Sequence, residues 1–370
     1  MMWMRLQDVC TVFSDGDWIE SKDQSDKGIR LVQTGNIGEG LYLEKEERAK
    51  YVSEETFESL KCTEIYPGDI LISRLPEPVG RACIIPQKKE RMITAVDCTI
   101  CRVDESIVSK EYLCYFMRSN AYYTKLLGSV TGTTRKRISK KNLGNIELEI
   151  PPKEEQTDVV SQLEYLINVI NSRNKELQLL DDIIKARFVE MFGEPRINPN
   201  KYPTKMIKDT CIVITGNTPS RKVDEYYGDA IEWIKTDNIV SGLLYPTVAS
   251  ESLSDSGKAV GRTVDAGAIL MACIAGSVAS IGRVCITDRE VAFNQQINAI
   301  VPKEYDVRFL HALLQISKDY LVEDINMALK GIMSKSKLEE KEFIVPVMEE
   351  QVGFAEFVEQ VDKSKLKKLR

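Results

Sequence analysis

Apolar residues recur in steps of four and three between Pro151 and Gly193. Apart from Arg173 and Arg187, every position at this spacing is apolar: Val159, Leu163, Leu166, Ile170, Leu177, Leu180, Ile184 and Met191. A seam of about five heptads is typical of a helix that pairs with another helix. Prolines before it and Gly193 after it delimit a helix roughly 50 Å long. The alternative, a core helix of one large domain, is disfavoured because core helices are usually shorter and have a broader apolar face.

The segments on either side of this helix repeat each other. Five blocks recur in the same order: Ile29–Ile37 with Ile231–Ile239, Pro67–Ser73 with Ala266–Ala272, Val79–Ile84 with Ile281–Ile286, Ala95–Ile100 with Ala292–Ile297, and Ile150–Gln156 with Val345–Gln351. The spacing indicates an internal duplication of about 195 to 200 residues. We therefore expect two globular domains, residues 1–150 and 194–347, each followed by a helix, residues 151–193 and 348–370.

Short apolar runs separated by turn residues predict mixed strands and helices, an α+β class. We expect helices over Glu44–Leu60 and Lys110–Leu127. Residues Ala266–Gly282 alone resemble a small-residue helix. Their counterpart in the first half contains prolines, which helix interiors exclude, so we expect strand, loop and strand in both halves.

The second helix is expected to start near Glu349 and to pair with the first helix. Its apolar positions match Val159, Leu163 and Leu166 of the first helix: Phe354, Val358 and Val361. Because the second helix is about half as long, we expect Asn174–Met191 to have no counterpart within the chain. Arg173 and Arg187 are then expected to face partner subunits or the globular domains.

Composition narrows the class of protein. The chain has 370 residues, 43% of them hydrophobic and 29% charged, as in soluble proteins with room for two domains. Neither a signal peptide nor a membrane span is expected. Nine cysteines without a secretion signal indicate reduced thiols and a cytoplasmic protein. A net charge of −6 argues against a whole-surface nucleic-acid binder and leaves room for a local basic patch.

Motifs for catalysis are missing from the sequence. The one histidine, His311, lies in an apolar helical segment, where an incidental packed histidine is the plainer interpretation. Cys98 and Cys101 form a single C-x-x-C, and a structural zinc site needs four ligands. Phosphate-loop and dinucleotide fingerprints do not match. We therefore expect no catalytic residue, no metal and no cofactor.

Recognition chemistry is concentrated in basic, hydroxyl-rich loops. In the first half the loop 131–141 contains Thr133, Thr134, Arg135, Lys136, Arg137 and Lys140. The matching loop in the second half contains Lys330, Ser334 and Lys335. Cations bind phosphates, and hydroxyls and backbone amides fix the register on DNA. One such loop could simply be a run of solvated charges. The recurrence of the basic loop at equivalent positions in both halves favours DNA contact.

Further candidates for DNA contact lie at strand ends and in one more exposed loop. They are Gln33, Thr34, Asn36 and Arg74 in the first half, and Thr218, Ser220, Arg221, Lys222, Lys235, Thr236 and Asn238 in the second. At the strand ends, turns closed by their own Asn and Thr side chains are an equally good interpretation.

Three motifs resemble a known family. Each helix starts with a variant of I-P-P-x-E-E-Q, and the central helix ends in Arg187–Pro195, which contains Met-Phe-Gly-Glu-Pro. Thr215–Ser220 is similar to a G-x-T-P-S segment that opens the second recognition domain in many relatives. With these residues the chain resembles the specificity subunit (S, HsdS) of type I restriction-modification systems over essentially its whole length.

The resemblance implies two tandem target-recognition domains, each reading one half of a split double-stranded DNA site. It also implies an antiparallel helical spacer, docking of two methyltransferase (M) subunits, and restriction (R) subunits that join them. The short second helix departs from the family pattern.

Three rival interpretations remain at this stage. One is a solo specificity subunit of a methylation-only complex. The second is a fused methyltransferase or nuclease, which the missing motifs oppose. The third is a coiled-coil scaffold that does not bind DNA.

Overall fold

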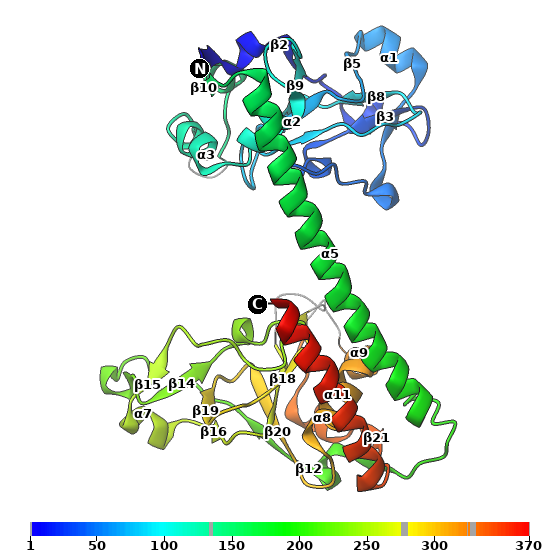
Figure 1. Cartoon of the computed structure of the whole chain (residues 1–370), viewed down its shortest axis with the longest axis vertical. Helices are drawn as coiled ribbons and strands as arrows, with labels where there is room; N and C mark the ends of the chain where they lie inside the picture. Colours follow the sequence, from blue (N-terminus) through cyan, green and yellow to red (C-terminus); the bar gives the residue numbers. More distant parts are fainter. Residues whose placement is uncertain (1, 133–135, 275–279, 324, 326–330, 370) are drawn as a thin grey trace. The chain divides into compact units, whose positions relative to one another are not determined.

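A computed structural model of the chain describes residues 2–132, 136–274, 280–323, 325 and 331–369, with side chains in the last helix as far as Lys365. The chain divides into two units, Met1–Ile170 (unit 1) and Asn171–Arg370 (unit 2). Each unit contains short strands and helices, which confirms the α+β class with tandem domains (Figure 1).

Unit 1 contains two four-stranded sheets and a two-stranded ribbon. The first sheet has the order β2 (Cys10–Asp15), β9 (Cys98–Val103), β6 (Ile70–Ser73), β7 (Ala82–Ile84). The second has the order β4 (Tyr51–Val52), β3 (Ile29–Val32), β8 (Met92–Thr94), β5 (Glu64–Ile65). The ribbon pairs β1 (Met2–Arg5) with β10 (Glu147–Ile150). Strands β3 and β8 are parallel, whereas the other pairs are antiparallel.

The four short α-helices of unit 1 each begin at a serine whose hydroxyl accepts a backbone hydrogen bond from the first turn, a common N-cap arrangement. They are α1 (Glu54–Leu60), α2 (Lys110–Phe116), α3 (Asn120–Leu127) and α4 (Lys140–Gly144). The expected helix Glu44–Leu60 is wrong in its first part, because Tyr51–Val52 pairs with β3 and Ser53 starts the helix. The expected helix Lys110–Leu127 is two helices, because Ser119 is extended and caps α3.

Unit 2 repeats this arrangement. Its first sheet has the order β12 (Cys211–Thr215), β20 (Ile297–Pro302), β17 (Ile269–Ala272), β18 (Val284–Ile286). Its second has the order β13 (Tyr227–Gly228), β15 (Ser252–Leu253), β14 (Ile231–Ile234), β19 (Val291–Phe293), β16 (Thr263–Val264). A ribbon pairs β11 (Thr204–Met206) with β21 (Glu342–Ile344), and β14 and β19 form the parallel pair. For Ala266–Gly282 the structure has a strand, β17, and not the alternative helix. The second strand, β18, begins after Gly282. Residues 275–279 lie outside the described residues.

The short helices of unit 2 follow the same order. They are α6 (Ile207–Thr210), α7 (Asp255–Val260), α8 (Val307–Ile316), α9 (Lys318–Val322) and α10 (Lys335–Glu339). None of the helices within the described residues combines the length and the apolar character that crossing a membrane requires.

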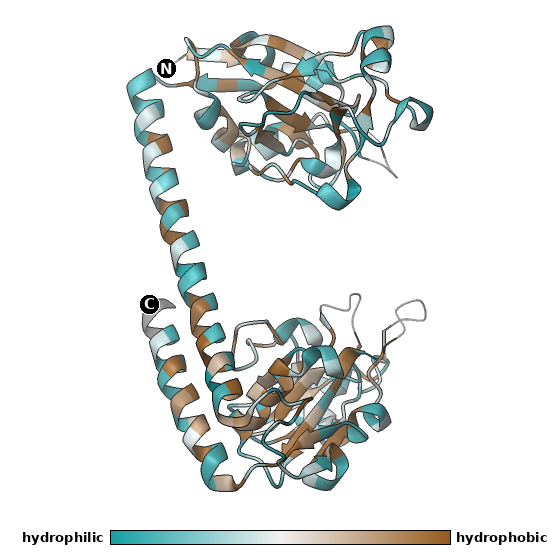
Figure 2. Cartoon of the chain, turned by 90° about the vertical axis from the view of Figure 1, so that its right-hand side faces the viewer, coloured by the Kyte–Doolittle hydropathy of each residue, from teal (hydrophilic) through white to brown (hydrophobic). Residues whose placement is uncertain are grey.

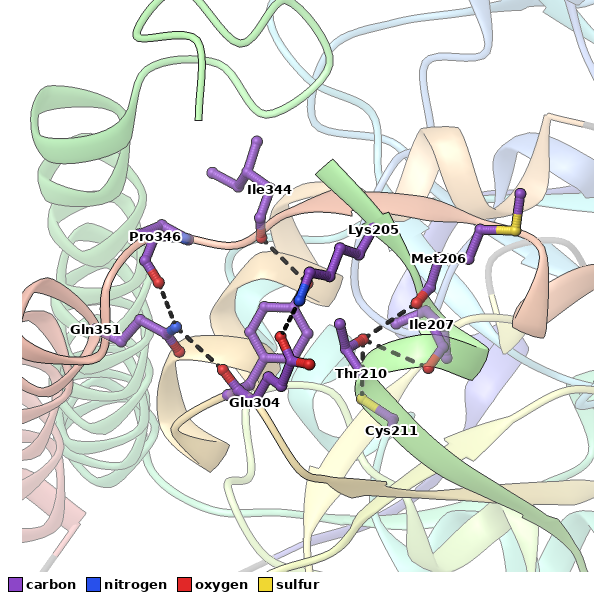
Figure 3. Close-up of polar contacts among 10 residues, drawn as sticks. Lys205, Met206, Ile207, Thr210, Cys211, Glu304, Ile344, Pro346 and Gln351 are labelled. Carbon is purple, nitrogen blue, oxygen red and sulfur yellow. Dashed lines mark hydrogen bonds and ion pairs between the residues drawn. The ribbon is translucent and has the colours of Figure 1, made fainter. Parts of the chain in front are cut away.

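The two long helices start at matching anchors. Helix α5 spans Lys153–Phe192 and α11 spans Met348–Leu369. Gln156 in α5 accepts a hydrogen bond from the Ser109 backbone and donates to the carbonyls of Ile107 and Pro151. In α11, Gln351 accepts from the Asp306 backbone. It donates to the carbonyls of Glu304 and Pro346 (Figure 3). Both glutamines are 1% exposed, so the last residue of the I-P-P-x-E-E-Q motif fixes each helix to its globular unit.

Within unit 2, α11 runs antiparallel to the C-terminal part of α5 (Figures 1 and 2). The ring of Phe354 lies 5.4 Å from that of Phe188 and 5.7 Å from that of Phe192. Further along, Lys365 Nζ pairs with Asp181 Oδ1 at 2.6 Å. The expectation that Asn174–Met191 has no counterpart is therefore wrong. It assumed that repeat-equivalent residues lie side by side, whereas antiparallel pairing places the start of α11 next to the end of α5.

The motif around Met-Phe-Gly-Glu-Pro supplies core residues. Phe188 and Phe192 are fully buried with Phe309 of α8 and Phe354 of α11. Arg187 pairs with Glu190 at 2.8 Å and lies 5.9 Å from the Phe357 ring of α11. Arg173 pairs with Glu176 in the same way.

The seam residues of the two helices differ in burial along their length. Phe354, Val358 and Val361 are buried, and Leu177, Leu180 and Ile184 are half-buried. In the part of α5 that belongs to unit 1, Val159 and Leu163 are half-buried. Leu166 and Ile170 remain 53% and 57% exposed.

Candidate nucleic-acid interface

The basic loop of unit 1 forms a hairpin. Thr131 and Arg137 exchange two backbone hydrogen bonds of 2.9 Å. Lys136, Arg137 and Lys140 are exposed, and Arg137 pairs with Asp97 at 3.0 Å. The predicted residues Thr133, Thr134 and Arg135 lie outside the described residues. The hairpin therefore presents cations to solvent, where they can contact phosphates.

Arg74 supports this hairpin from the interior of unit 1. Its side chain is 4% exposed, donates to the Val96 carbonyl at 2.5 Å and lies 3.3 Å from Asp15. Its own carbonyl accepts a hydrogen bond from Ile138, at the end of the hairpin. The guanidinium is thus used inside the unit, and its geometry favours a supporting role over direct contact with DNA.

The basic loop of unit 2 occupies the equivalent place. Ser334 caps α10 by accepting from Lys337, as Ser139 caps α4 in unit 1. Ile332 forms a bridge with Ile274, and the Met333 backbone donates to the Cys273 carbonyl. Lys335 is exposed and lies 3.5 Å from Glu339, whereas Lys330 falls outside the described residues.

The predicted strand-end residues separate into two groups. Asn36 and Asn238 are 7% and 8% exposed and close their own turns, accepting from the backbones of Gln33 and Lys235. Their amide groups donate to the following segments. This geometry favours the turn-closing alternative for both asparagines. The side chains of Gln33, Thr34, Lys235 and Thr236 are only partly buried and can still take part in contacts.

Two arginines that the sequence interpretation missed hold these turns. Arg81 donates to the carbonyls of Thr34, Ile37, Leu75 and Pro78. Arg283 donates to the carbonyls of Thr236 and Ser280. Both stand in the repeated Gly-Arg of the third sequence block, and that repetition was the available signal.

The Thr215–Ser220 segment has a structural and an exposed part. A Cβ at Gly216 would overlap the Asn294 carbonyl oxygen, so only glycine fits there. Asn217 accepts from the Arg262 backbone and donates to the Val260 carbonyl, both at 2.8 Å. Beyond these anchors, Thr218, Ser220, Arg221 and Lys222 are exposed. Thr218 donates to Gln295, a residue that the sequence did not single out.

Next to this loop lies a charged cluster, here called the Glu251 cluster, made of Arg221, Lys235 and Glu251. The Glu251 carboxylate pairs with Arg221 at 2.5 Å and with Lys235 at 2.6 Å. Hydrogen bonds from Lys235 and Arg221 lower the pKa of Glu251. Arg221 also lies 4.3 Å from the Tyr227 ring and 5.1 Å from the Trp233 ring. Two predicted cations from separate segments are thus brought together by an acid that the sequence interpretation missed.

The groups considered for catalysis or metal binding are buried. His311 is 6% exposed, and Cys98 and Cys101 are fully buried on opposite faces of β9. All nine cysteines are free thiols. In the part of the chain that the structure describes, no set of three or more His, Cys, Asp or Glu side chains is placed to hold a metal ion.

Comparison with known proteins identifies the family. The profile of the type I restriction modification DNA specificity domain matches residues 1–181 and 199–370. The HindI type I restriction enzyme specificity subunit of Haemophilus influenzae is 22% identical over 326 residues, 68% of this chain and 70% of that protein. The MjaIX specificity subunit of Methanocaldococcus jannaschii is 31% identical over 182 residues, 47% of this chain and 41% of that protein. The chain thus aligns with less than half of the second relative's length.

Two solved structures share the fold. The type I restriction-modification S subunit of M. genitalium aligns with a TM-score of 0.54 at 10% identity, covering 99% of this chain and 90% of that chain. A chain from a study of complex assembly and conformational transition of the type I R-M system aligns with a TM-score of 0.55 at 17% identity, covering 99% and 91%. These findings show that the chain belongs to the DNA specificity family of type I restriction-modification systems, as a non-catalytic subunit that recognises DNA sequence.

Proposed function

We propose that each unit reads one half of a bipartite double-stranded DNA site. The observation that carries this proposal is the duplication of the surface itself: each unit presents an exposed basic loop with a serine-capped helix after it, and a strand-end turn held by an arginine. The two surfaces belong to different units that share one helix of 40 residues. Because each surface belongs to its own unit, we expect unread base pairs between the two half-sites.

The residues proposed to contact DNA are those that the fold leaves accessible, together with those outside its described part. In unit 1 they are Gln33, Thr34, Thr133, Thr134, Arg135, Lys136, Arg137 and Lys140; in unit 2 they are Thr218, Ser220, Arg221, Lys222, Lys235, Thr236, Lys330, Ser334 and Lys335. Asn36, Arg74 and Asn238 support these surfaces from inside. Lysines favour phosphate contact, whereas arginines can also form paired hydrogen bonds with guanine.

We further propose that two methyltransferase subunits dock on the helices α5 and α11, with restriction subunits joining that complex. The exposed apolar side chains of α5 support this docking, since Tyr165, Leu166 and Ile170 are 69%, 53% and 57% exposed. An apolar stripe of this kind is typical of a helix that pairs with a partner.

Methylation-sensitive sequencing of DNA from cells that carry the chain and its methyltransferase subunit tests the bipartite site. We expect a motif in two specified halves separated by unspecified bases. A single continuous motif would contradict the proposal. Co-purification with a nuclease-translocase distinguishes a full restriction system from a solo specificity subunit that supports methylation only.

A further inference from the structure

The turn between β19 and β20 of unit 2 carries three amide side chains in a row, Asn294, Gln295 and Gln296. Asn294 is 5% exposed, and its side-chain oxygen accepts a hydrogen bond of 3.0 Å from the Gln296 backbone. The side-chain nitrogen of Asn294 donates to the Gln296 side chain at 3.2 Å. The first and third amides are therefore used to close the turn, whereas Gln295 between them is exposed to solvent.

Two other segments of unit 2 hold this turn in place. The Asn294 backbone donates to the Ile234 carbonyl at 3.0 Å, at the point where the parallel strands β14 and β19 end side by side (Figure 1). From the Thr215–Ser220 segment, the Asn217 backbone donates to the Phe293 carbonyl at 3.1 Å. The backbone of the turn is thus fixed before any ligand binds. A side chain on a fixed backbone loses less conformational freedom on binding, which favours a specific contact.

Thr218 orients the side-chain amide of Gln295, because its hydroxyl donates a hydrogen bond to Gln295 Oε1. An amide oxygen can accept two hydrogen bonds and an amide nitrogen can donate two, so Gln295 can still accept one and donate two. Thr218 is among the residues proposed to contact DNA, and so is Lys235, which directly follows Ile234 at the end of β14. An exposed donor and an exposed acceptor therefore lie together next to the proposed DNA surface.

Adenine presents the complementary pair of groups in the major groove of DNA. Its N7 atom accepts a hydrogen bond and its N6 amino group donates one, so a glutamine amide can bind both at once. Guanine offers two acceptors at this edge, cytosine offers a donor, and thymine offers an acceptor beside a methyl group. The amide of Gln295 therefore fits adenine better than the other three bases.

Unit 1 has the same turn without the exposed amide. The Cys98 backbone closes the turn between β8 and β9 by donating to the Ala95 carbonyl at 2.9 Å. In unit 2 the Ile297 backbone closes the turn in the same way, at 3.1 Å. Counted from these bonds, Val96 stands where unit 2 has Gln295. A valine side chain forms no hydrogen bond with a base, so the two units differ in chemistry at this position.

We propose that Gln295 is a base-reading residue of unit 2, whose side-chain amide recognises one adenine of the half-site through N7 and the N6 amino group. This inference rests on the proposed function of the units as readers of DNA. Thr218 serves as a positioning residue for the amide. Unit 1 makes no equivalent contact at Val96.

The test uses the assembled complex of the chain with its methyltransferase subunits, and methylation sequencing first gives the wild-type motif. Gln295→Met replaces the amide by an apolar side chain of similar length, so one A·T pair in one half of the motif should no longer be required. Affinity for the matching duplex should fall by about 5- to 140-fold, the range of one paired base contact. Affinity for DNA without a site should not change. Gln315→Met, at an exposed position of α8, is the matched control and should change neither quantity.

A base analogue tests the contact at the level of single atoms. Each adenine of the half-site that is not itself methylated is replaced in turn by 7-deazaadenine, which lacks the N7 acceptor. At one position the wild-type complex should lose about 2- to 12-fold in affinity, the range of one net hydrogen bond, whereas the Gln295→Met complex should lose nothing further.

Three results would overturn the proposal: an unchanged motif in Gln295→Met, relaxation at a G·C pair, or an equal loss of affinity for every duplex. A continuous wild-type motif would instead contradict the bipartite site. The response to Gln295→Met would still decide whether this residue reads adenine.

Discussion

Glu251 is the residue that most directly limits the positive charge of the proposed unit 2 surface. It neutralises Arg221 and Lys235 at 2.5 and 2.6 Å. If these cations bind phosphates, DNA must compete with the carboxylate for them. Glu251→Gln should therefore raise the affinity of the assembled methyltransferase complex for non-specific DNA by about 3- to 10-fold and steepen the log–log salt slope by about 1.

A matched control for this variant lies in the same unit. Glu290 pairs with Lys258 at 2.6 Å, with both side chains about equally exposed. Glu290→Gln removes the same charge. Because neither Glu290 nor Lys258 belongs to the proposed DNA surface, the salt slope should stay unchanged. Filter binding over a range of salt concentrations measures both quantities. Weaker DNA binding by Glu251→Gln would show that the carboxylate positions the two cations and does not compete with DNA.

His311 predicts a pH dependence of stability that is confined to unit 2. Its pKa is about 4 in the folded chain against 6.5 ordinarily, with Lys365 and Arg308 adding to the effect of burial. Between these values the unfolded chain binds the extra proton, so stability is complete above pH 6.5 and falls as pH decreases towards 4. From pH 7.5 to 5.5 the loss is about 1 kcal/mol.

Hydrogen exchange provides the measurement for this prediction. Amides of α8 should lose protection between pH 7.5 and 5.5, after correction for intrinsic exchange rates, more than amides of α2 in unit 1, which carries Cys114 at the matching position. In His311→Leu the difference between the two helices should vanish. An equal loss of protection in both helices of the wild-type chain would contradict the assignment.

At this scale the sequence identified residue types better than residue roles. The sequence identified hydroxyls, amides and cations in exposed loops, because the residue types of a loop can be read directly from the sequence. Whether an amide faces solvent or its own turn depends on backbone geometry, and Asn36 and Asn238 turned inward. Glu251 was missed because the pairing of β14 with β15 brings it next to Lys235, which lies 16 residues away in the sequence. Side chains far apart in the sequence become neighbours by strand register, which one sequence does not contain.

At the scale of elements, the matching glutamines allow the anchoring of each long helix at its first turn to be tested. Gln351→Ala leaves the Asp306 N–H and the carbonyls of Glu304 and Pro346 without their side-chain partner. Loss of three such contacts should cost about 2 to 4 kcal/mol of local stability. Hydrogen exchange should then show faster opening of the first turns of α11 and unchanged exchange at the start of α5.

Gln156→Ala is the reciprocal variant. It removes the same three contacts from α5 and should loosen only that helix start. Each variant thus serves as the control for the other. If either one destabilised both helix starts equally, the glutamines would be general core residues, and the motif would have no anchoring role of its own.

The helices also show what periodicity can and cannot predict. The bounds of α5 follow from Pro152 and Gly193, because these residues exclude or end a helix locally. The lack of a packing partner for Asn174–Met191 was predicted wrongly. An apolar stripe indicates that a helix has a partner, but it does not give the register of the pair. Phe354 packs against Phe188 and Phe192 and not beside its repeat equivalent.

At the scale of the whole molecule, the internal repeat was the strongest predictor. It implied that both units share one fold, and apart from the additional edge strand β13 of unit 2 the sheets indeed have equivalent strand orders with one parallel pair each. The strand order itself was not predictable, because sequentially distant strands such as β2 and β9 become neighbours. Such pairings depend on long-range packing, and local patterns do not encode them.

The two units also predict separable effects on the DNA site. Lys136 and Arg137 are exposed on the hairpin of unit 1, whereas Arg221 and Lys222 are exposed on unit 2. In the assembled complex, Lys136→Ala with Arg137→Ala should weaken DNA binding and flatten the salt slope by about 2, because each lost phosphate contact releases about one counterion fewer.

The same double variant decides whether the units read separate half-sites. If they do, methylation sequencing should show relaxed specificity only in one half of the motif, with the other half unchanged. The matched double variant Arg221→Ala with Lys222→Ala should relax the opposite half. Relaxation of the same bases by both variants would mean that the two units converge on one site. Unchanged DNA binding in both variants would remove these loops from the interface.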